Sequence, residues 1–228
     1  MKKSQKNILF FKQISKKDIA LVGGKNGSLG EMIQVLSKKG ISLPDGFAIT
    51  SHGYWTFIGY NQLDKKLKEV FKGFNPKSIK SLQATGKKAR ALIMASELPA
   101  SLAKEIIPAY KKLSQKYDEE QSEVAVRTSG VAEDAPTASF AGQFESFLNV
   151  KGEEALLKAV KKCLTSTFGD RVIAYREEKK IDHLKFAMSV GVQKMVRSDL
   201  ASAGIIFTLD TETGFDKVVL INSIYGVG

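Results

Sequence analysis

Residues 126–143 read VRTSGVAEDAPTASFAGQ, and this stretch decides how the rest of the chain is interpreted. A short apolar run at 124–126 leads into Arg127, and a loop of small and hydroxylated residues is expected to follow. Small residues let backbone N–H groups approach a ligand closely, and successive N–H groups in such a loop form an anion-binding hollow. The guanidinium of Arg127 adds a planar, permanently charged fork for phosphate oxygens. The stretch therefore predicts a polyphosphate-binding loop, although an ordinary turn-rich connection with a surface arginine has the same composition.

Length and composition predict a globular protein. A chain of 228 residues with 43% hydrophobic content can bury a sizeable core, as one large domain or two closely packed lobes. The single cysteine, Cys163, excludes an intrachain disulfide and fits a reducing compartment. No apolar run approaches the roughly 20 residues that a membrane span needs. We therefore expect a cytoplasmic protein with no membrane partner.

The formal net charge of +11 has two readings. It could indicate binding to nucleic acid, which would be tight and salt-dependent. However, the lysines are scattered through segments of helical pattern, without interleaved aromatic residues or a nucleic-acid motif. A solvated basic face explains the charge better, so we expect no nucleic-acid partner. A positive field would in any case favour the capture of an anionic nucleotide.

Residues 1–120 are predicted to form a mostly helical lobe. Apolar residues at helical spacing, capping residues and well-placed prolines support this interpretation. The predicted elements are a strand at 8–11, a helix at 26–38 that follows a Gly23-Gly24 turn and ends at Gly40, a strand at 46–50, a helix capped by Thr50 or Ser51, and at least three helices within 62–117 with Pro76 and Pro99 in first turns.

Residues 121–228 are predicted to form a β-rich lobe. Strands joined by short turns, together with segregated helices, predict the α+β class with an antiparallel or mixed sheet. The predicted strands lie at 124–126, 145–150, 186–196, 204–209 and 217–222, the helices at 153–167 and 170–179, and a hairpin loop at 211–214.

Three segments resemble motifs of the phosphoenolpyruvate synthase and pyruvate phosphate dikinase family, in the family's order. They cover nearly the whole chain, and the resemblance is closest to the N-terminal ATP-binding domain of the synthases. This implies an ATP-grasp-like fold in which two α+β lobes hold ATP between them. The segments are LVGGKNGSLGEM at 21–32 with LPDGFAIT at 43–50, RTS at 127–129 through SFAGQ at 139–143, and VQKMV at 192–196 with AGIIFT at 203–208.

The resemblance also implies roles for individual residues. Lys25 and Arg127 correspond to the family's catalytic, phosphate-binding cations, and Thr128 stands where the family usually has serine. Lys25 also follows two glycines at a predicted helix start, where N–H groups favour an anion. The implied phosphate contacts are Lys25, Arg127, Thr128, Ser129, Ser139 and Gly142, and the implied adenine contacts are Gln193, Lys194, Met195 and Val196.

The family's reaction converts ATP, pyruvate and water to AMP, phosphoenolpyruvate and phosphate through a phosphohistidine on another domain. Neither His52 nor His183 lies in a motif like the family's Thr-Cys-His segment, and Cys163 is expected in the core. Three alternatives stay open: a dikinase with phosphate as second acceptor, a rifampicin phosphotransferase, and a nucleotide-binding module without catalysis.

The sequence ends at Gly228, before the acidic residues that hold Mg²⁺ in the synthases. We therefore expect ATP and Mg²⁺ as cofactors, with the metal ligands beyond residue 228 and none within it. We also expect an ATP-binding fold truncated at its C-terminal end. Its partners would be the pyruvate-binding and phosphohistidine domains of a longer protein. By itself this stretch is expected to bind nucleotide without transferring phosphate, because phosphoryl transfer depends on metal.

Overall fold

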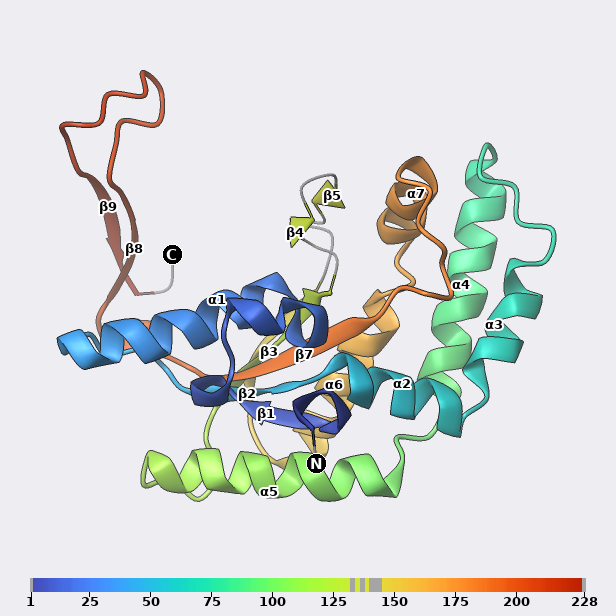
Figure 1. The fold of residues 1–228 in the computed structure, drawn as a ribbon, viewed down its shortest axis with the longest axis horizontal. Coiled ribbons are helices and arrows are strands. Elements are labelled where there is room, and N and C mark those ends of the chain that lie inside the picture. The colour runs from blue at the N-terminus through green and yellow to red at the C-terminus, as the bar shows by residue number, and fades with distance from the viewer. Residues whose placement is uncertain (1, 132–133, 136–137, 140–144, 227–228) are drawn as a thin grey trace. The chain divides into compact units, whose positions relative to one another are not determined.

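The computed structural model describes residues 2–131, 134–135, 138–139 and 145–226 (Figure 1). Contacts divide the chain into two compact units, Met1–Met195 and Val196–Gly228, and each is described by itself. The predicted α+β class with an antiparallel sheet is confirmed. No helix in the described part of the chain is both long and apolar enough to span a membrane.

The first unit is built on a five-stranded sheet in which every neighbouring pair is antiparallel. The sheet joins strands from both sides of residue 120, the predicted lobe boundary. Its strands, in spatial order, are β1 (Ile8–Phe10), β2 (Gly46–Ile49), β7 (Met188–Lys194), β3 (Val124–Gly130) and β6 (Ser146–Val150).

One face of this sheet carries the main hydrophobic core, and we call it the core face. Alternate residues of β2, β3 and β7 point to it, and helices on that side bury them. Fully burying one such valine contributes about 1.5–3 kcal/mol. The core face comprises Phe47, Ile49, Val124, Val126, Val190 and Val192. Apart from α1, which lies on the other face, the α-helices of this unit are α2 (Ser51–Tyr60), α3 (Leu63–Phe71), α4 (Ile79–Ala95), α5 (Ala100–Lys116), α6 (Glu153–Ser166) and α7 (Asp170–Glu178).

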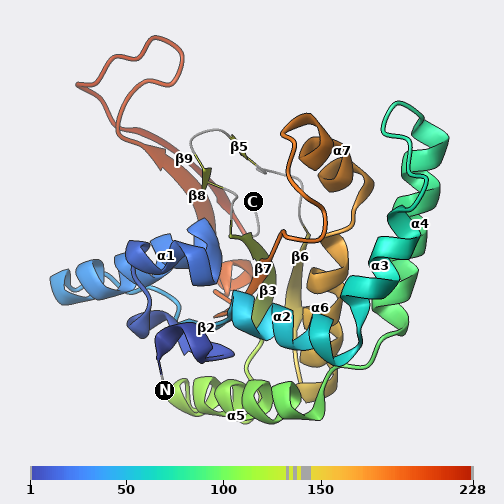
Figure 2. The ribbon, with the colours of Figure 1, turned by 45° about the vertical axis from the view of Figure 1, so that its right-hand side comes forward.

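Helix α1 (Ile19–Leu36) covers the opposite face, which we call the α1 face. Figures 1 and 2 show α1 and α5 on opposite sides of the sheet. Residues of β1, of β2 and of the segment after β1 form a second, smaller core with α1. That core comprises Leu9, Phe11, Ile14, Val22, Leu29 and Ala48. On the two central strands, the residues of the α1 face are Ala125, Arg127 and Ser129 of β3 and Ser189, Gly191 and Gln193 of β7.

Several predicted boundaries are confirmed in detail. Gly40 ends the α1 region in a left-handed conformation, with φ 77°. Thr50 caps α2, since its hydroxyl accepts a hydrogen bond of 3.3 Å from the amide of Gly53. Pro99, predicted in a first turn, is the N-cap residue of α5, one position before the helix. The placement of Pro76 was wrong: it lies in a turn before Ser78, and Ser78 caps α4.

The second unit contains a β-hairpin, as the sequence predicted. Its strands are β8 (Ser202–Phe207) and β9 (Leu220–Tyr225), paired antiparallel. The connecting loop is stabilised by Asp210, whose carboxylate accepts hydrogen bonds from the amide of Glu212 at 2.9 Å and the hydroxyl of Thr213 at 2.8 Å. Two further short strands, β4 (Asp134–Ala135) and β5 (Ala138–Ser139), pair with each other in the first unit.

Candidate functional site

Two motif segments that are about a hundred residues apart in sequence are in direct contact. The backbone of Gly23 lies on Ser129, so closely that an added Cβ would lie 2.3 Å from the Ser129 hydroxyl oxygen and 2.5 Å from its carbonyl oxygen. Gly23 has φ 74° and ψ 165°, a conformation that is essentially restricted to glycine. The amide of Asn26 then donates a hydrogen bond of 3.2 Å to the Ser129 hydroxyl. The Gly-Gly-Lys segment is thereby fixed on strand β3.

The contact interrupts α1 near its start. The sequence predicted a helix from residue 26 preceded by a glycine turn, whereas α1 begins at Ile19 and continues past a break at Gly23. The turn was correctly predicted, but the helical turn before it was missed. The reason is that residues 19–22 are held as helix by the second core, to which Val22 contributes.

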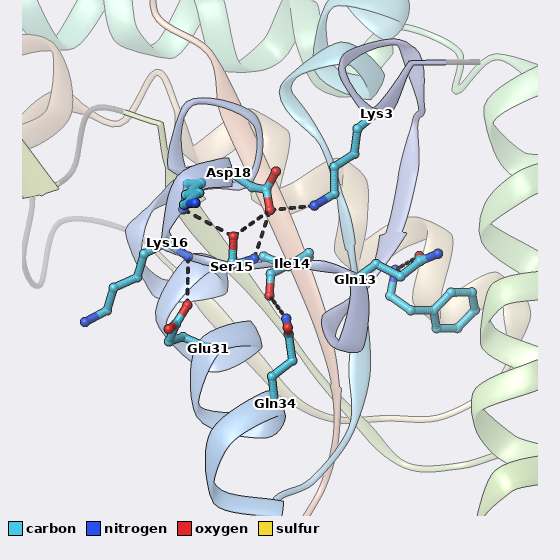
Figure 3. Close-up of polar contacts among 10 residues, drawn as sticks. Lys3, Gln13, Ile14, Ser15, Lys16, Asp18, Glu31 and Gln34 are labelled. Carbon is cyan, nitrogen blue, oxygen red and sulfur yellow. Dashed lines mark hydrogen bonds and ion pairs between the residues drawn. The ribbon is translucent and has the colours of Figure 1, made fainter.

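The segment before α1 holds this helix from both ends (Figure 3). The Asp18 carboxylate accepts hydrogen bonds from the amide and hydroxyl of Ser15, at 2.9 and 3.2 Å, and from the Lys3 ammonium at 2.6 Å. Burial alone would raise the pKa of Asp18, but the hydrogen bonds from Lys3 and Ser15 outweigh burial and lower it. Farther along α1, the Gln34 side chain donates to the carbonyl oxygen of Ile14. These contacts fix where α1 crosses the sheet.

Arg127 lies in a strand, which corrects the prediction that a loop begins after residue 126. β3 continues to Gly130 because it pairs along its whole length with β7. Arg127 stands opposite Gly191 and is half-buried on the α1 face. Ser129 lies two residues away on the same face. The structure therefore brings the Arg127 strand and the Lys25 turn to one face of the sheet.

The hydroxyl groups that follow Arg127 are engaged within the fold. Thr128 and Ser129 are each 1% exposed. The Thr128 hydroxyl donates to the carbonyl oxygen of Glu145 at 3.4 Å, and the Ser129 hydroxyl accepts from Asn26. Ser139, another predicted phosphate contact, lies in β5 opposite Asp134. The predicted contact at Gly142 lies outside the described residues.

The predicted adenine segment starts with the last two residues of β7, Gln193 and Lys194, and continues past the strand. Gln193 shares the α1 face with Arg127 and stands opposite Ala125, and its side-chain amide donates to the carbonyl oxygen of Pro44 at 3.1 Å. The Lys194 ammonium forms an ion pair of 3.0 Å with Glu119. These two side chains are therefore held in place by the surrounding fold.

The backbone of this segment is also partly used. The amide of Lys194 donates to the carbonyl oxygen of Asp45, and the amide of Met195 donates to that of Glu123, both at 2.9 Å. The resemblance assigned backbone groups here to the edge of adenine, but these two N–H groups already have partners. Val196 is exposed and begins the second unit.

Three residues of this site were missed from the sequence. The side-chain amide of Asn26 donates to the Ser189 hydroxyl at 3.2 Å, and Ser189 in turn donates to the carbonyl oxygen of Ile49 at 2.7 Å. Gly191 leaves room for Asn26, since a Cβ there would lie 2.3 Å from the Asn26 side-chain oxygen. The available signal for Ser189 and Gly191 was a polar residue and a glycine within an otherwise apolar run, whereas Asn26 carried no such signal.

The two histidines and the cysteine lie elsewhere in the fold. His52 pairs through Nδ1 with the Asn7 side-chain oxygen at 2.8 Å. His183 contacts Glu177 through Nε2 at 2.6 Å and stacks on Phe71, and burial, followed by the charge of Arg176, lowers its pKa. Cys163 is buried in the main core, as expected, and burial raises the pKa of its thiol. Among the described residues, no group of three or more His, Cys, Asp or Glu side chains could hold a metal ion.

The comparison with known families matches residues 19–228 to the pyruvate phosphate dikinase AMP/ATP-binding domain. The chain belongs to this family. All three motif segments of this family member lie within the matched residues. Lys25, Arg127 and Gln193 are therefore inside the matched region as well.

Curated relatives of this family member are named phosphoenolpyruvate synthase. The protein from Aquifex aeolicus is 48% identical over 99% of this chain and 26% of its own length. The proteins from Helicobacter pylori and Escherichia coli are 48% and 44% identical, each over 97% of this chain and 27% and 28% of their own length. The chain thus spans about a quarter of the length of these relatives.

Proposed function

We propose that this chain is the ATP-binding part of a phosphoenolpyruvate synthase, and that the α1 face binds the phosphates of ATP. The observation that carries the proposal is the close contact between Gly23 and Ser129. This contact brings the Lys25 turn and the Arg127 strand to the same side of one sheet. Relatives over nearly the whole chain are named phosphoenolpyruvate synthase, which favours the synthase over a dikinase or an antibiotic phosphotransferase.

In this proposal Lys25 and Arg127 bind and orient the phosphate chain. Arg127 offers a planar set of donors for two phosphate oxygens, and Lys25 offers a compact charge beside the helix amides that follow the glycine turn. Ser139 and Gly142 supply further phosphate contacts. Thr128 and Ser129 act mainly by shaping the strand, because their hydroxyls are buried and hydrogen-bonded within the fold.

Adenine would lie against the end of β7 and the residues after it. Since the amides of Lys194 and Met195 have partners, recognition there would use carbonyl oxygens and the apolar side chains of Met195 and Val196. The fold would be ATP-grasp-like, with residues 1–120 and 121–228 both supplying strands to the sheet that binds the nucleotide. A cytoplasmic location is part of the same proposal.

The full reaction would convert ATP, pyruvate and water to AMP, phosphoenolpyruvate and phosphate. A histidine on another domain would take a pyrophosphoryl group from ATP as AMP leaves, water would release one phosphate from it, and pyruvate bound by a further domain would accept the remaining phosphoryl group. Mg²⁺ would neutralise charge on the phosphates. The work proposed for the described residues of this chain is to bind and orient ATP.

Calorimetric titration of the natural full-length protein with ATP tests this proposal. Arg127→Ala should weaken ATP binding about ten- to a hundredfold, since a charge-assisted hydrogen bond contributes roughly 1.5–3 kcal/mol. Arg171→Ala, which removes an exposed arginine from α7, is the matched control and should leave affinity unchanged. Equal affinities for the wild type and Arg127→Ala would remove Arg127 from the site.

A further inference from the structure

Asn26 lies at the centre of the contact between α1 and the sheet. Its side chain is 1% exposed and lies between strands β3 and β7 and the turn that carries Lys25. Its backbone amide is bonded to Ser129 of β3, and its side-chain amide is bonded to Ser189 of β7. One residue therefore ties α1 to both central strands, directly beside Lys25.

The Asn26 side chain contributes only one hydrogen bond to stability, from its amide nitrogen to the Ser189 hydroxyl. Its side-chain oxygen is buried and has no hydrogen-bond partner among the described residues. An unsatisfied buried acceptor is destabilising, whereas an apolar residue of similar size would fill the same space without that penalty. A buried polar side chain that is only partly hydrogen-bonded can instead specify one arrangement of the elements around it.

The surrounding residues leave space for this side chain. The three heavy atoms nearest to an added Cβ at Gly191 all belong to the Asn26 side chain, the nearest at 2.3 Å. Gly191 also stands opposite Arg127 in the sheet. The Ser189 hydroxyl accepts from Asn26 while it donates to Ile49, so its orientation is fixed on the far side as well.

We propose that Asn26 is a positioning residue that holds the Lys25 turn on the strand of Arg127, so that both cations face one anionic ligand. The part that concerns ATP rests on the proposed function. Asn26 would act through Lys25 and Arg127 rather than by touching the nucleotide. Loss of its side chain should therefore loosen the turn and weaken ATP binding together.

The test uses the natural full-length protein and two measurements. The first is hydrogen exchange of the backbone amides of residues 24–26 without ligand, and the second is ATP affinity by calorimetry. Asn26→Ala should speed exchange and weaken ATP binding, each by about tenfold, the factor that corresponds to one buried hydrogen bond. Ser114→Ala is the matched control, because the Ser114 hydroxyl is also buried and accepts a hydrogen bond, from the amide of Ser122 at 2.9 Å. It should change neither quantity.

A second pair of variants separates positioning from general damage. Gly191→Ala displaces the Asn26 side chain and should mimic Asn26→Ala. The double variant Asn26→Ala/Gly191→Ala should be no worse than Asn26→Ala alone, because the three atoms nearest to the new methyl group have been removed. If Asn26→Ala does not fold, Ser189→Ala removes the same contact from the other side and takes its place.

The outcomes are distinct. The positioning role would be overturned by unchanged exchange and affinity in Asn26→Ala, or by additive losses in the double variant. The proposed function would still stand in that case, as long as the wild type binds ATP. If the wild type binds no ATP, the proposed function fails, and the exchange measurement alone then decides whether Asn26 holds the turn. Faster exchange with unchanged ATP affinity would limit Asn26 to a structural role and contradict the proposal.

Discussion

The two faces of the five-stranded sheet are made by the same strands but differ in their side chains. On β3 and β7, the core face presents valines that are fully buried against helices. The α1 face presents serine, glycine, arginine and glutamine from the intervening positions. Large apolar residues gain stability from burial, whereas small residues let the α1 backbone approach the strands closely. Alternation along each strand thus separates the residues that stabilise the fold from those that arrange the proposed ligand site.

The largest expected effect concerns close approach on the α1 face. Gly23→Ala should lower the free energy of unfolding by roughly 3–5 kcal/mol, because its Cβ would overlap the backbone of Ser129 and its φ and ψ are strained for alanine. Gly40→Ala is the matched control. Gly40 also has a positive φ, but nothing lies within 4 Å of an added Cβ, so about 1–2 kcal/mol is expected. Equal losses in urea unfolding would mean that the contact with Ser129 contributes nothing.

The next prediction separates the two faces on a single strand. Val192→Ala leaves a cavity on the core face and should lower the free energy of unfolding by about 2–3 kcal/mol, without changing the ATP affinity of the folded protein. Ser189→Ala, on the α1 face of the same strand, should lower it by only about 1 kcal/mol but weaken ATP binding. The reverse pattern would show that the faces do not divide these tasks.

A smaller effect is expected from pH on the core side. Burial and the charge of Arg176 lower the pKa of His183 in the folded protein, so the unfolded chain takes up a proton first as pH falls. The contribution of His183 to stability should therefore be fully present above about pH 6.5. The free energy of unfolding should decrease as pH falls from there through the lower, folded pKa. His183→Gln should flatten this decrease in urea titrations between pH 7 and 5. An unchanged slope would contradict the assignment to His183.

The sequence predicted most elements because their apolar spacing is local information. Residues within a short stretch of sequence were enough to predict three such features. These are the hairpin loop at 211–214, the helix at 153–167 and the end of α1 at Gly40. Residues 127–130 were wrongly predicted as a loop, because small polar residues are typical of loops. Only their pairing with β7 makes them a strand. The link between Asn26 and Ser189 joins positions 163 residues apart, so no local pattern could reveal it. The family motifs named Lys25 and Arg127, but the contact of Gly23 with Ser129 had to come from the structure.

The central claim is that Lys25 and Arg127 bind the outer phosphates of ATP from one face of the sheet. Affinities for ATP and AMP, measured by calorimetry on the full-length wild type, Lys25→Ala and Arg127→Ala, test it most directly. AMP lacks the outer phosphates, so each variant should lose about ten- to a hundredfold in ATP affinity and little in AMP affinity. Equal losses for both nucleotides, or no loss for either, would contradict the account.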